Sequence, residues 1–165
     1  MAIYRVKQFM WAITAKFKPI DEEIIDKYLN KDEKKLFKQL SFSDMHHCIR
    51  VCNDALTKYK QEDIDIDKLA KIALLHDIGK ASASLNIIDK SVIVIVDKIT
   101  NGKLKKYNFN KKIDTYYNHP KKSVALLNNI NRYDSEFLEA IEQHHYKEIG
   151  INIYLKIVKE CDDNN

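Results

Sequence analysis

Residues 67–80, DKLAKIALLHDIGK, decide the fold of this chain. Leu69, Ile72 and Ala73 recur at the spacing of one helix face, and His76 continues the same stripe. The pattern predicts a helix over residues 67–77 whose apolar face packs into a core. Because the stripe ends on a histidine, chemistry is expected at the end of this helix.

The end of this helix combines a histidine, a carboxylate and a glycine. Gly79 is the residue type that ends helices in the left-handed conformation, so the helix is predicted to end there. Neighbouring residues of a helix point about 100° apart, so His76 and Asp77 address one ion only if it lies beside the helix end. An inward carboxylate is costly unless it is paired or metal-bound, and the negative end of the helix dipole favours a cation.

The composition favours long helices in a single domain. The chain has 165 residues, enough for one domain with a core, but only 3 glycines and 2 prolines for tight turns. An all-α, single-domain helical bundle is therefore expected. Apolar periodicity predicts N-terminal helices over Ile3–Phe17, Asp21–Leu29 and Lys31–Leu40. These helices form an N-terminal helical cap, residues 1–41, of the same domain whose main part is residues 42–165.

The main part is expected to be helical throughout, with one long loop. A helix begins near Ser43, which is a good N-cap residue. Residues 85–99 fit a helix or a strand, and the helical surroundings favour a helix. The lysine-rich residues 101–118 are interpreted as a mobile loop of the kind used as a lid. Pro120 is predicted to stand at the first position of a helix that runs to Leu127, and further helices are predicted over Ser135–His145 and Ile151–Cys161.

Charge and cysteine usage exclude several classes of function. The net charge of +4 comes from lysines mixed with acidic residues, which favours a solvated surface, and no nucleic-acid partner is expected. Basic residues interrupt the apolar residues of positions 1–20, so no signal peptide is expected. No run approaches the roughly 18 apolar residues of a membrane span. The 3 cysteines make an odd number that fits a reducing compartment, so a cytoplasmic protein is expected.

Other polar side chains are predicted to share the face of the His76–Asp77 pair. Asp162 follows Leu155 and Val158 at helical spacing, and His144 follows Ile141 in the same way. His119 precedes a proline, so it is expected at a helix N-terminus open to a central cleft. Nitrogen and oxygen ligands without thiolate suit Mn, Fe, Co, Ni or Zn, and Mg where carboxylates dominate.

These residues resemble the pattern of the HD superfamily, in which a histidine precedes a His-Asp pair and a distant aspartate follows. The matching residues are His47, His76 with Asp77, and Asp162. The run from Leu74 to Lys80, LLHDIGK, is similar to the HDIG form of the motif over seven consecutive positions. His47 is preferred to its neighbour His46 because a valine follows it four residues later, as in the family.

Further histidines resemble those of family members that hold two metals. His119 with Pro120, and His144 with His145, stand in the corresponding places. The resemblance implies an HD-type helical bundle with a metal site in the central cleft, formed by one or two divalent ions. His47, His76, Asp77 and Asp162 would bind the metal, with His119, His144 and a further candidate, His145, for a second ion. Asp162 lies three residues before the last residue printed. Because the ends of helices fray, Asp163 is an alternative ligand.

The function implied by the resemblance is metal-dependent hydrolysis of a phosphate ester by a metal-activated water. The substrate would be a nucleotide or a related small phosphorylated molecule. Asp77, Lys80, His119 and His144 would be catalytic, and Lys80 and His145 would contact the substrate. A single inward histidine is more often a hydrogen-bonded core residue, but several such residues in family order favour a metal site.

Two other functions remain compatible with the sequence. One is a mixed-valence di-iron oxygenase, because some proteins of this fold use the same six ligands to cleave bonds with O₂. The other is a non-catalytic module that binds a nucleotide or a partner. The chain has no Gly-Tyr-Pro element, which disfavours the cyclic-dinucleotide phosphodiesterases of the HD-GYP type.

Overall fold

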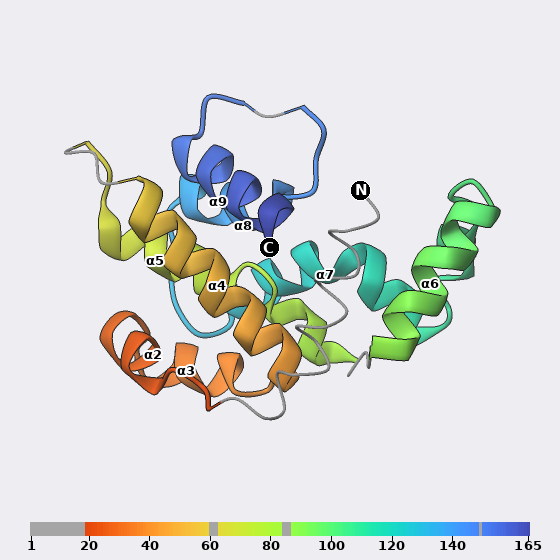
Figure 1. Ribbon diagram of the computed structural model, residues 1–165, viewed down its shortest axis with the longest axis horizontal. Coiled ribbons are helices and arrows are strands. Elements are labelled where there is room, and N and C mark those ends of the chain that lie inside the picture. Colours follow the sequence, from red (N-terminus) through yellow and green to blue (C-terminus); the bar gives the residue numbers. More distant parts are fainter. Residues whose placement is uncertain (1–18, 60–62, 84–86, 149) are drawn as a thin grey trace.

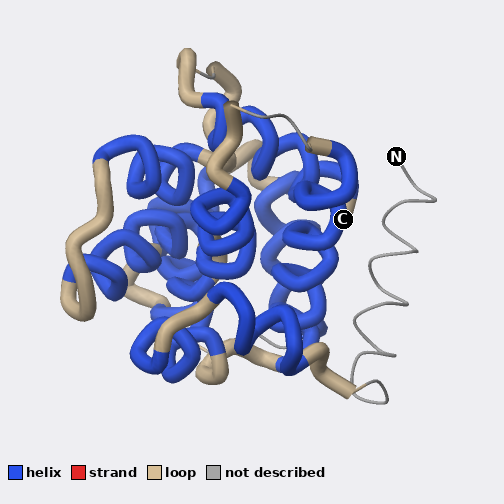
Figure 2. The backbone as a smooth tube through the Cα atoms, turned by 90° about the vertical axis from the view of Figure 1, so that its left-hand side faces the viewer, coloured by secondary structure: helices blue, strands red, loops and turns tan. Residues whose placement is uncertain are grey.

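The computed structural model describes residues 19–59, 63–83, 87–148 and 150–165. Within these ranges the regular structure is helical and contains no strand, as Figure 2 shows. In chain order the helices are α2 (Glu22–Tyr28), α3 (Lys31–Phe37), α4 (Phe42–Lys58), α5 (Ile66–Leu75), η2 (Ile78–Ser82), α6 (Ile87–Ile99), η3 (Lys103–Tyr107), α7 (Lys111–Asn128), α8 (Ser135–Gln143) and α9 (Ile153–Asn164), η denoting a 3₁₀ helix. The all-α prediction is confirmed. The predicted helix over residues 3–17 lies outside the described residues.

Seven of the α-helices, α2 to α5 and α7 to α9, begin at polar side chains that accept hydrogen bonds from free backbone N–H groups. Asn30 and Glu33 form a reciprocal capping box at α3. At α4 the cap is Ser41, whose hydroxyl accepts a hydrogen bond from the Asp44 N–H at 3.2 Å. Helix α4 thus begins at Phe42, one residue before the predicted Ser43, and its cap is Ser41 rather than Ser43. Helices α2 and α3 pack against α5, and the division of the domain at residue 41 stays a prediction.

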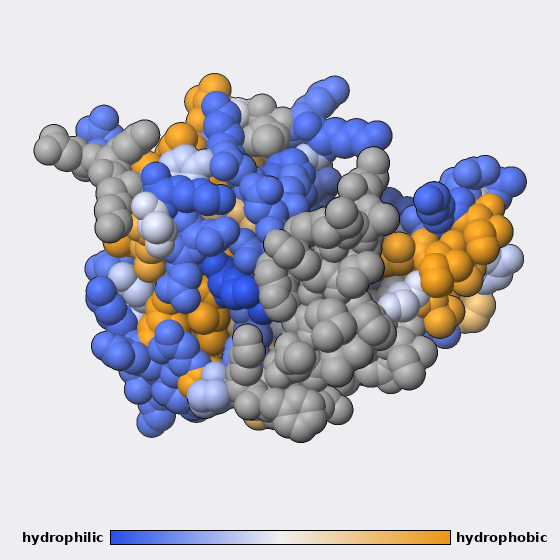
Figure 3. Space-filling model, viewed as in Figure 1, coloured by the Kyte–Doolittle hydropathy of each residue, from blue (hydrophilic) through white to orange (hydrophobic). Residues whose placement is uncertain are grey.

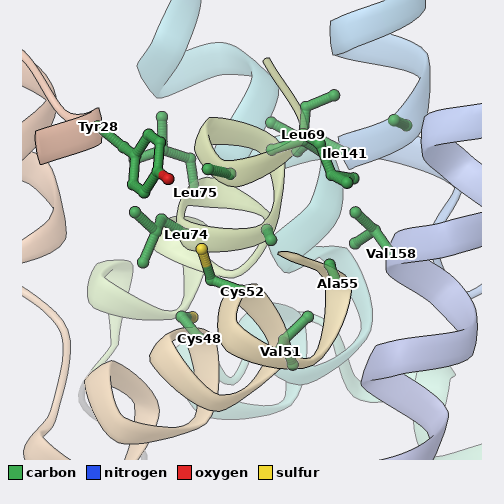
Figure 4. Packing of buried hydrophobic residues seen from close by; sticks show 14 of the residues in the cluster. Tyr28, Cys48, Val51, Cys52, Ala55, Leu69, Leu74, Leu75, Ile141 and Val158 are labelled. Atoms are coloured by element: carbon green, nitrogen blue, oxygen red, sulfur yellow. The ribbon is translucent and has the colours of Figure 1, made fainter. Parts of the chain in front are cut away.

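The core lies where α4 and α5 pack side by side, with α8 and α9 against them (Figures 1 and 4). Figure 4 shows Cys48 and Cys52 of α4 on the side of Leu74 of α5, and all three are fully buried. Fully burying a side chain such as leucine or valine contributes roughly 1.5–3 kcal/mol to folding. The three cysteines are free and buried, as expected for small apolar side chains.

Helix α5 ends earlier than predicted, and Gly79 does not end it. The helix stops at Leu75, His76 is its C-cap, and Gly79 lies inside η2. Gly79 has no positive φ; among the described glycines only Gly102 has one. A Cβ atom at Gly79 would instead lie 2.1 Å from the carbonyl oxygen of His119 on α7. Glycine is required at this position because two backbone segments approach closely, and not because of its backbone angles.

The lysine-rich segment is mostly helical, so its interpretation as a loop was wrong. Asn110 caps α7, and its side chain accepts a hydrogen bond from the Lys112 N–H at 3.0 Å. This cap starts the helix nine residues before Pro120, which therefore lies inside α7 and not at its first position. His119 accordingly stands in the middle of α7, where a helix N-terminus was predicted. The proline is tolerated there because a side chain takes over the hydrogen bond that it cannot make, as described below.

The segment of ambiguous pattern, α6, is a helix and not a strand. Together with η3 it projects from the rest of the molecule at the right of Figure 1. Asn101 and Gly102, with φ of 49° and 79°, reverse the chain between the two helices. Across the described ranges, no helix has both the length and the apolar character required to cross a bilayer.

Candidate metal centre

Every residue predicted for the site lies in one cluster. Five segments contribute to it: α4, the turn after α5, α7, the end of α8, and α9. The clustered residues are His47, His76, Asp77, Lys80, His119, His144, His145 and Asp162. Residues more than 100 positions apart thus meet in the folded chain, since the side chains of His47 and Asp162 lie 2.9 Å apart.

Three of the histidines are oriented by the same local contact. The Nδ1 atom of each ring lies within hydrogen-bond distance of the carbonyl oxygen three residues earlier. The pairs are His76 with Ala73 at 2.8 Å, His119 with Tyr116 at 2.9 Å, and His144 with Ile141 at 2.7 Å. Because a carbonyl can only accept, Nδ1 carries the proton. The lone pair of Nε2 is therefore directed at the cluster, as in histidines that bind metals.

Each of these carbonyl groups is available for a physical reason. Helices α5 and α8 end at Leu75 and Gln143, and carbonyls in the last turn of a helix have no backbone donor. Inside α7 the reason is Pro120, which has no N–H to donate to the carbonyl of Tyr116 four residues before it. The His119 ring makes that hydrogen bond instead. The proline thus helps to fix the ring that precedes it.

The first group of donor atoms comes from His47, His76 and Asp162, whose ligand atoms lie within 4.8 Å of one another. The Asp162 Oδ1 atom lies 2.9 Å from Nε2 of His47 and 3.8 Å from Nε2 of His76. Asp162 lies within α9, so this part of the cluster is held by regular structure. The alternative, Asp163, is exposed and pairs with Lys159 at 3.3 Å, outside the cluster.

The second group consists of Asp77, His119, His144 and His145. Oδ1 of Asp77 lies 3.1 Å from Nε2 of His119 and 3.9 Å from Nε2 of His144. Nε2 of His145 is 3.1 Å from Nε2 of His119, although half of the His145 side chain is exposed. These contacts put His145 in the cluster, and among the described residues His46 is in neither group.

Asp77 stands between the two groups. Its Oδ2 atom faces the first group, at 3.5 Å from Nε2 of His76 and 3.7 Å from Nε2 of His47. Its Oδ1 atom faces the second group. One carboxylate therefore presents an oxygen to each group, which is the arrangement required of a ligand that bridges two ions.

The electrostatics of the cluster suit a cation. Burial lowers the pKa of His76 and His144, and it lowers the pKa of His145 to about 4, so these rings are neutral at neutral pH. Burial opposes ionisation of Asp77, but its contacts, of which the Lys80 ammonium is the strongest, outweigh burial and hold the pKa of Asp77 well below the usual range. The pKa of Asp162 is lowered in the same way, chiefly by His47. Neutral imidazoles with ionised carboxylates are the protonation states that metal binding needs.

Two further side chains adjoin the cluster. The Lys80 ammonium forms an ion pair with Oδ2 of Asp77. Burial disfavours its charge, but the nearby carboxylates raise its pKa, so it stays protonated. Cys48 also lies near His76 and Asp77, a position that the sequence interpretation missed because Cys48 fits the apolar face of α4. Burial raises the pKa of this thiol well above its usual range, which favours the neutral form over a thiolate ligand.

Ser123 of α7 forms hydrogen bonds with the turn that contains His76 and Asp77. Its hydroxyl accepts a hydrogen bond from the Gly79 N–H at 2.8 Å and donates one to the His76 carbonyl at 2.9 Å. The serine is fully buried, so water does not replace these bonds. It therefore helps to set the distance between Asp77 and His119, on different elements. Sequence reasoning assigned no such role to Ser123.

Replacing Ser123 by Ala is expected to lower the free energy of unfolding by roughly 2–4 kcal/mol, because a buried N–H and a buried carbonyl each lose a partner. Urea unfolding followed by circular dichroism measures this. Ser135→Ala is the control, since that serine is exposed at the first turn of α8 and should change stability by less than about 0.5 kcal/mol. Equal effects in the two variants would contradict the role given to Ser123.

The buried polar atoms of the cluster fit a metal ion. Among the described residues, Nε2 of His76 and Nε2 of His144 are buried and lack a hydrogen-bond partner. Leaving such atoms unpaired costs free energy, and a bound cation would remove that cost. The donors are imidazole nitrogens and carboxylate oxygens, a set that suits first-row divalent ions. The residues present therefore fit one or two divalent ions.

Comparison with protein families gives one match. The family model described as HD domain matches residues 45–163, which include both donor groups. No match was found among curated proteins or among solved structures.

Proposed function

The chain belongs to the HD domain family, and from this premise we propose that it is a metal-dependent phosphohydrolase. Many members of the family are metal-dependent hydrolases. The observation that carries the proposal is the placement of Asp77 between two groups of inward donor atoms, with the Lys80 ammonium against it. The substrate would be a nucleotide or a related small phosphorylated molecule.

In this proposal His47, His76, Asp77 and Asp162 hold one divalent ion, and His119, His144 and His145 with Asp77 hold a second. A divalent ion in such a site supplies Lewis acidity, which makes a water molecule nucleophilic near neutral pH and neutralises charge on a phosphate. The backbone contacts of His76, His119 and His144 keep Nε2 aimed inward, so little reorganisation is needed on binding.

Lys80 and, where it does not hold the second ion, His145 are assigned to the substrate. Lys80 is protonated beside the cluster, so it would stabilise negative charge on the phosphate as the ester bond breaks. His145 is the most exposed histidine of its donor group, with 47% of its side chain accessible, and is therefore suited to contact the substrate. His119 or His144, where not occupied by an ion, would exchange a proton at Nε2.

The test is elemental analysis of protein purified without chelator or metal-affinity tag, together with hydrolysis of a generic phosphate ester. The His76→Ala, Asp77→Ala double variant is expected to lose both bound metal and hydrolysis. The matched control is the His46→Ala, Asp163→Ala double variant, which removes the neighbours of two proposed ligands and should keep its metal. Unchanged hydrolysis in the first variant, or no metal in the native chain even after supplementation, would refute the proposal.

A second candidate is the mixed-valence di-iron oxygenase, because the six ligands that this activity would use all lie in the cluster. They are His47, His76, Asp77, His119, His144 and Asp162. The same elemental analysis separates the two activities. Two irons per chain together with oxygen uptake would favour the oxygenase. One or two other divalent ions with phosphate release would favour the hydrolase.

A further inference from the structure

The arm formed by α6, η3 and the start of α7, residues 87–112, carries an unusual share of exposed apolar side chains. Five of the nine large hydrophobic side chains that are exposed among the described residues lie on it: Val92, Ile95, Ile99, Tyr107 and Phe109. Ile99 is 74% exposed and Phe109 is 84% exposed. Figure 3 shows hydrophobic surface gathered over the α6 region, with hydrophilic surface beside it.

Three of these residues form one stripe. Val92, Ile95 and Ile99 are separated by three and four positions, so they lie on one face of α6. Ile93 of the same helix is buried, so α6 packs through another face and leaves the stripe uncovered. Exposed apolar residues grouped in this way mark an interaction surface more often than scattered ones do.

The same arm is strongly basic. It contains seven lysines and two aspartates, a net charge of +5 in a chain whose total is +4. Both aspartates are engaged, Asp89 with Lys112 at 2.8 Å and Asp97 with the hydroxyl of Tyr117. Within the part of the chain that the structure describes, no carboxylate forms an ion pair with the exposed lysines Lys98, Lys103, Lys105, Lys106 or Lys111. Their charge is available to a partner.

We propose that this arm docks the protein on the surface of an anionic lipid bilayer. The aliphatic and aromatic side chains would enter the interface between headgroups and acyl chains, and the lysines would contact lipid phosphates. An anionic bilayer would thus bind both the exposed apolar side chains and the lysines of the arm. The arm lies outside the donor groups, so docking is independent of the proposed hydrolysis.

Two other partners fit the arm less well. A second copy of the chain would bring two clusters of positive charge together. The stripe from Val92 to Ile99 is also only about 10 Å long, which is short for an interface that must bury roughly 800 Å² on each side. A nucleic acid could use the lysines and the rings of Tyr107 and Phe109, but it would leave the aliphatic stripe of Val92, Ile95 and Ile99 uncovered, since aliphatic side chains neither stack on bases nor bond to them.

The test is cosedimentation with vesicles of phosphatidylcholine alone or mixed with phosphatidylglycerol. The chain is expected to bind the mixed vesicles, to bind them more weakly as the salt concentration rises, and not to bind vesicles of phosphatidylcholine alone. Lys103→Gln, Lys105→Gln and Lys106→Gln together should weaken binding about a hundredfold, at about fivefold for each lysine. The matched control removes three exposed lysines elsewhere, Lys31, Lys147 and Lys156, and should bind as the native chain does.

The apolar contribution is tested separately by Ile95→Gln with Ile99→Gln, which leaves the charge unchanged and should weaken binding tenfold or more. If this variant loses helix content, the lysine variant alone decides, because it changes only exposed residues. Absence of binding to the mixed vesicles, or equal loss in the control, would overturn the proposal. So would arm-dependent binding of an oligonucleotide without vesicle binding, or a dimer that the isoleucine variant dissociates.

Discussion

Replacing Asp77 by Asn is expected to reduce hydrolysis of a phosphate ester by a hundredfold to a thousandfold or more, with loss of bound metal. The substitution keeps the shape of the side chain and removes its negative charge. Because this carboxylate faces both donor groups, its charge would act on either ion. Removing one partner from a buried charge pair costs roughly 3–5 kcal/mol, and each 1.4 kcal/mol corresponds to about a factor of ten.

The comparison for this prediction is Asp163→Asn. That carboxylate lies next to Asp162, is exposed, and among the described residues pairs with Lys159 of the same helix, so its loss should leave metal content and hydrolysis near the native values. Elemental analysis and phosphate release are measured on both variants at equal protein concentration. If Asp77→Asn keeps its metal and its rate, the bridging role of Asp77 is wrong.

Among Gly→Ala substitutions at the described glycines, Gly79→Ala is expected to lower the free energy of unfolding the most. The new Cβ atom would lie 2.1 Å from the carbonyl oxygen of His119 and 2.7 Å from the backbone nitrogen of Ser123. Both obstacles are backbone atoms of α7, so no flexible side chain can move aside. We expect a loss of about 3 kcal/mol or more in the free energy of unfolding, and weaker metal binding, because His119 would move away from Asp77.

Gly150→Ala provides the matched control. A Cβ atom at Gly150 meets nothing within 4 Å, and Gly150 is not among the described residues with positive φ. The control should therefore be neutral or stabilising by up to about 1 kcal/mol. Urea unfolding and metal content are measured on both variants. Similar stability of the two would show that η2 and α7 do not pack as closely as the structure places them.

Local patterns in the sequence predicted the helices well, because their causes are local. The spacing of Leu69 and Ile72 indicates an inward helix face whatever the rest of the chain does. The inward positions of His76, His144 and Asp162 followed from the same periodicity, and the structure brings all three together. Their roles as ligands stay predictions, and so do those of Lys80 and His145.

The sequence interpretation failed where a side-chain contact or a distant segment, and not the local sequence pattern, determined the structure. Pro120 favours a helix start, but the Asn110 cap starts α7 earlier and the His119 ring bonds to the carbonyl that the proline leaves free. Gly79 resembles a helix terminator, but the approach of α7 explains it. Ser123 carries no signal of its own, because its two partners lie more than 40 residues away in the chain.

The sequence by itself therefore determined that the chain is helical, which faces of its helices are buried, and which histidines and aspartates point inward. Only the tertiary structure decided that Asp77 stands between two groups of donors, that His145 joins one of them, and that Ser123 fastens the turn to α7. The physical reason is the range of the interactions. Helix periodicity is set by neighbours within a few residues, whereas the distance between Asp77 and His119 is set by packing between segments that are remote in sequence.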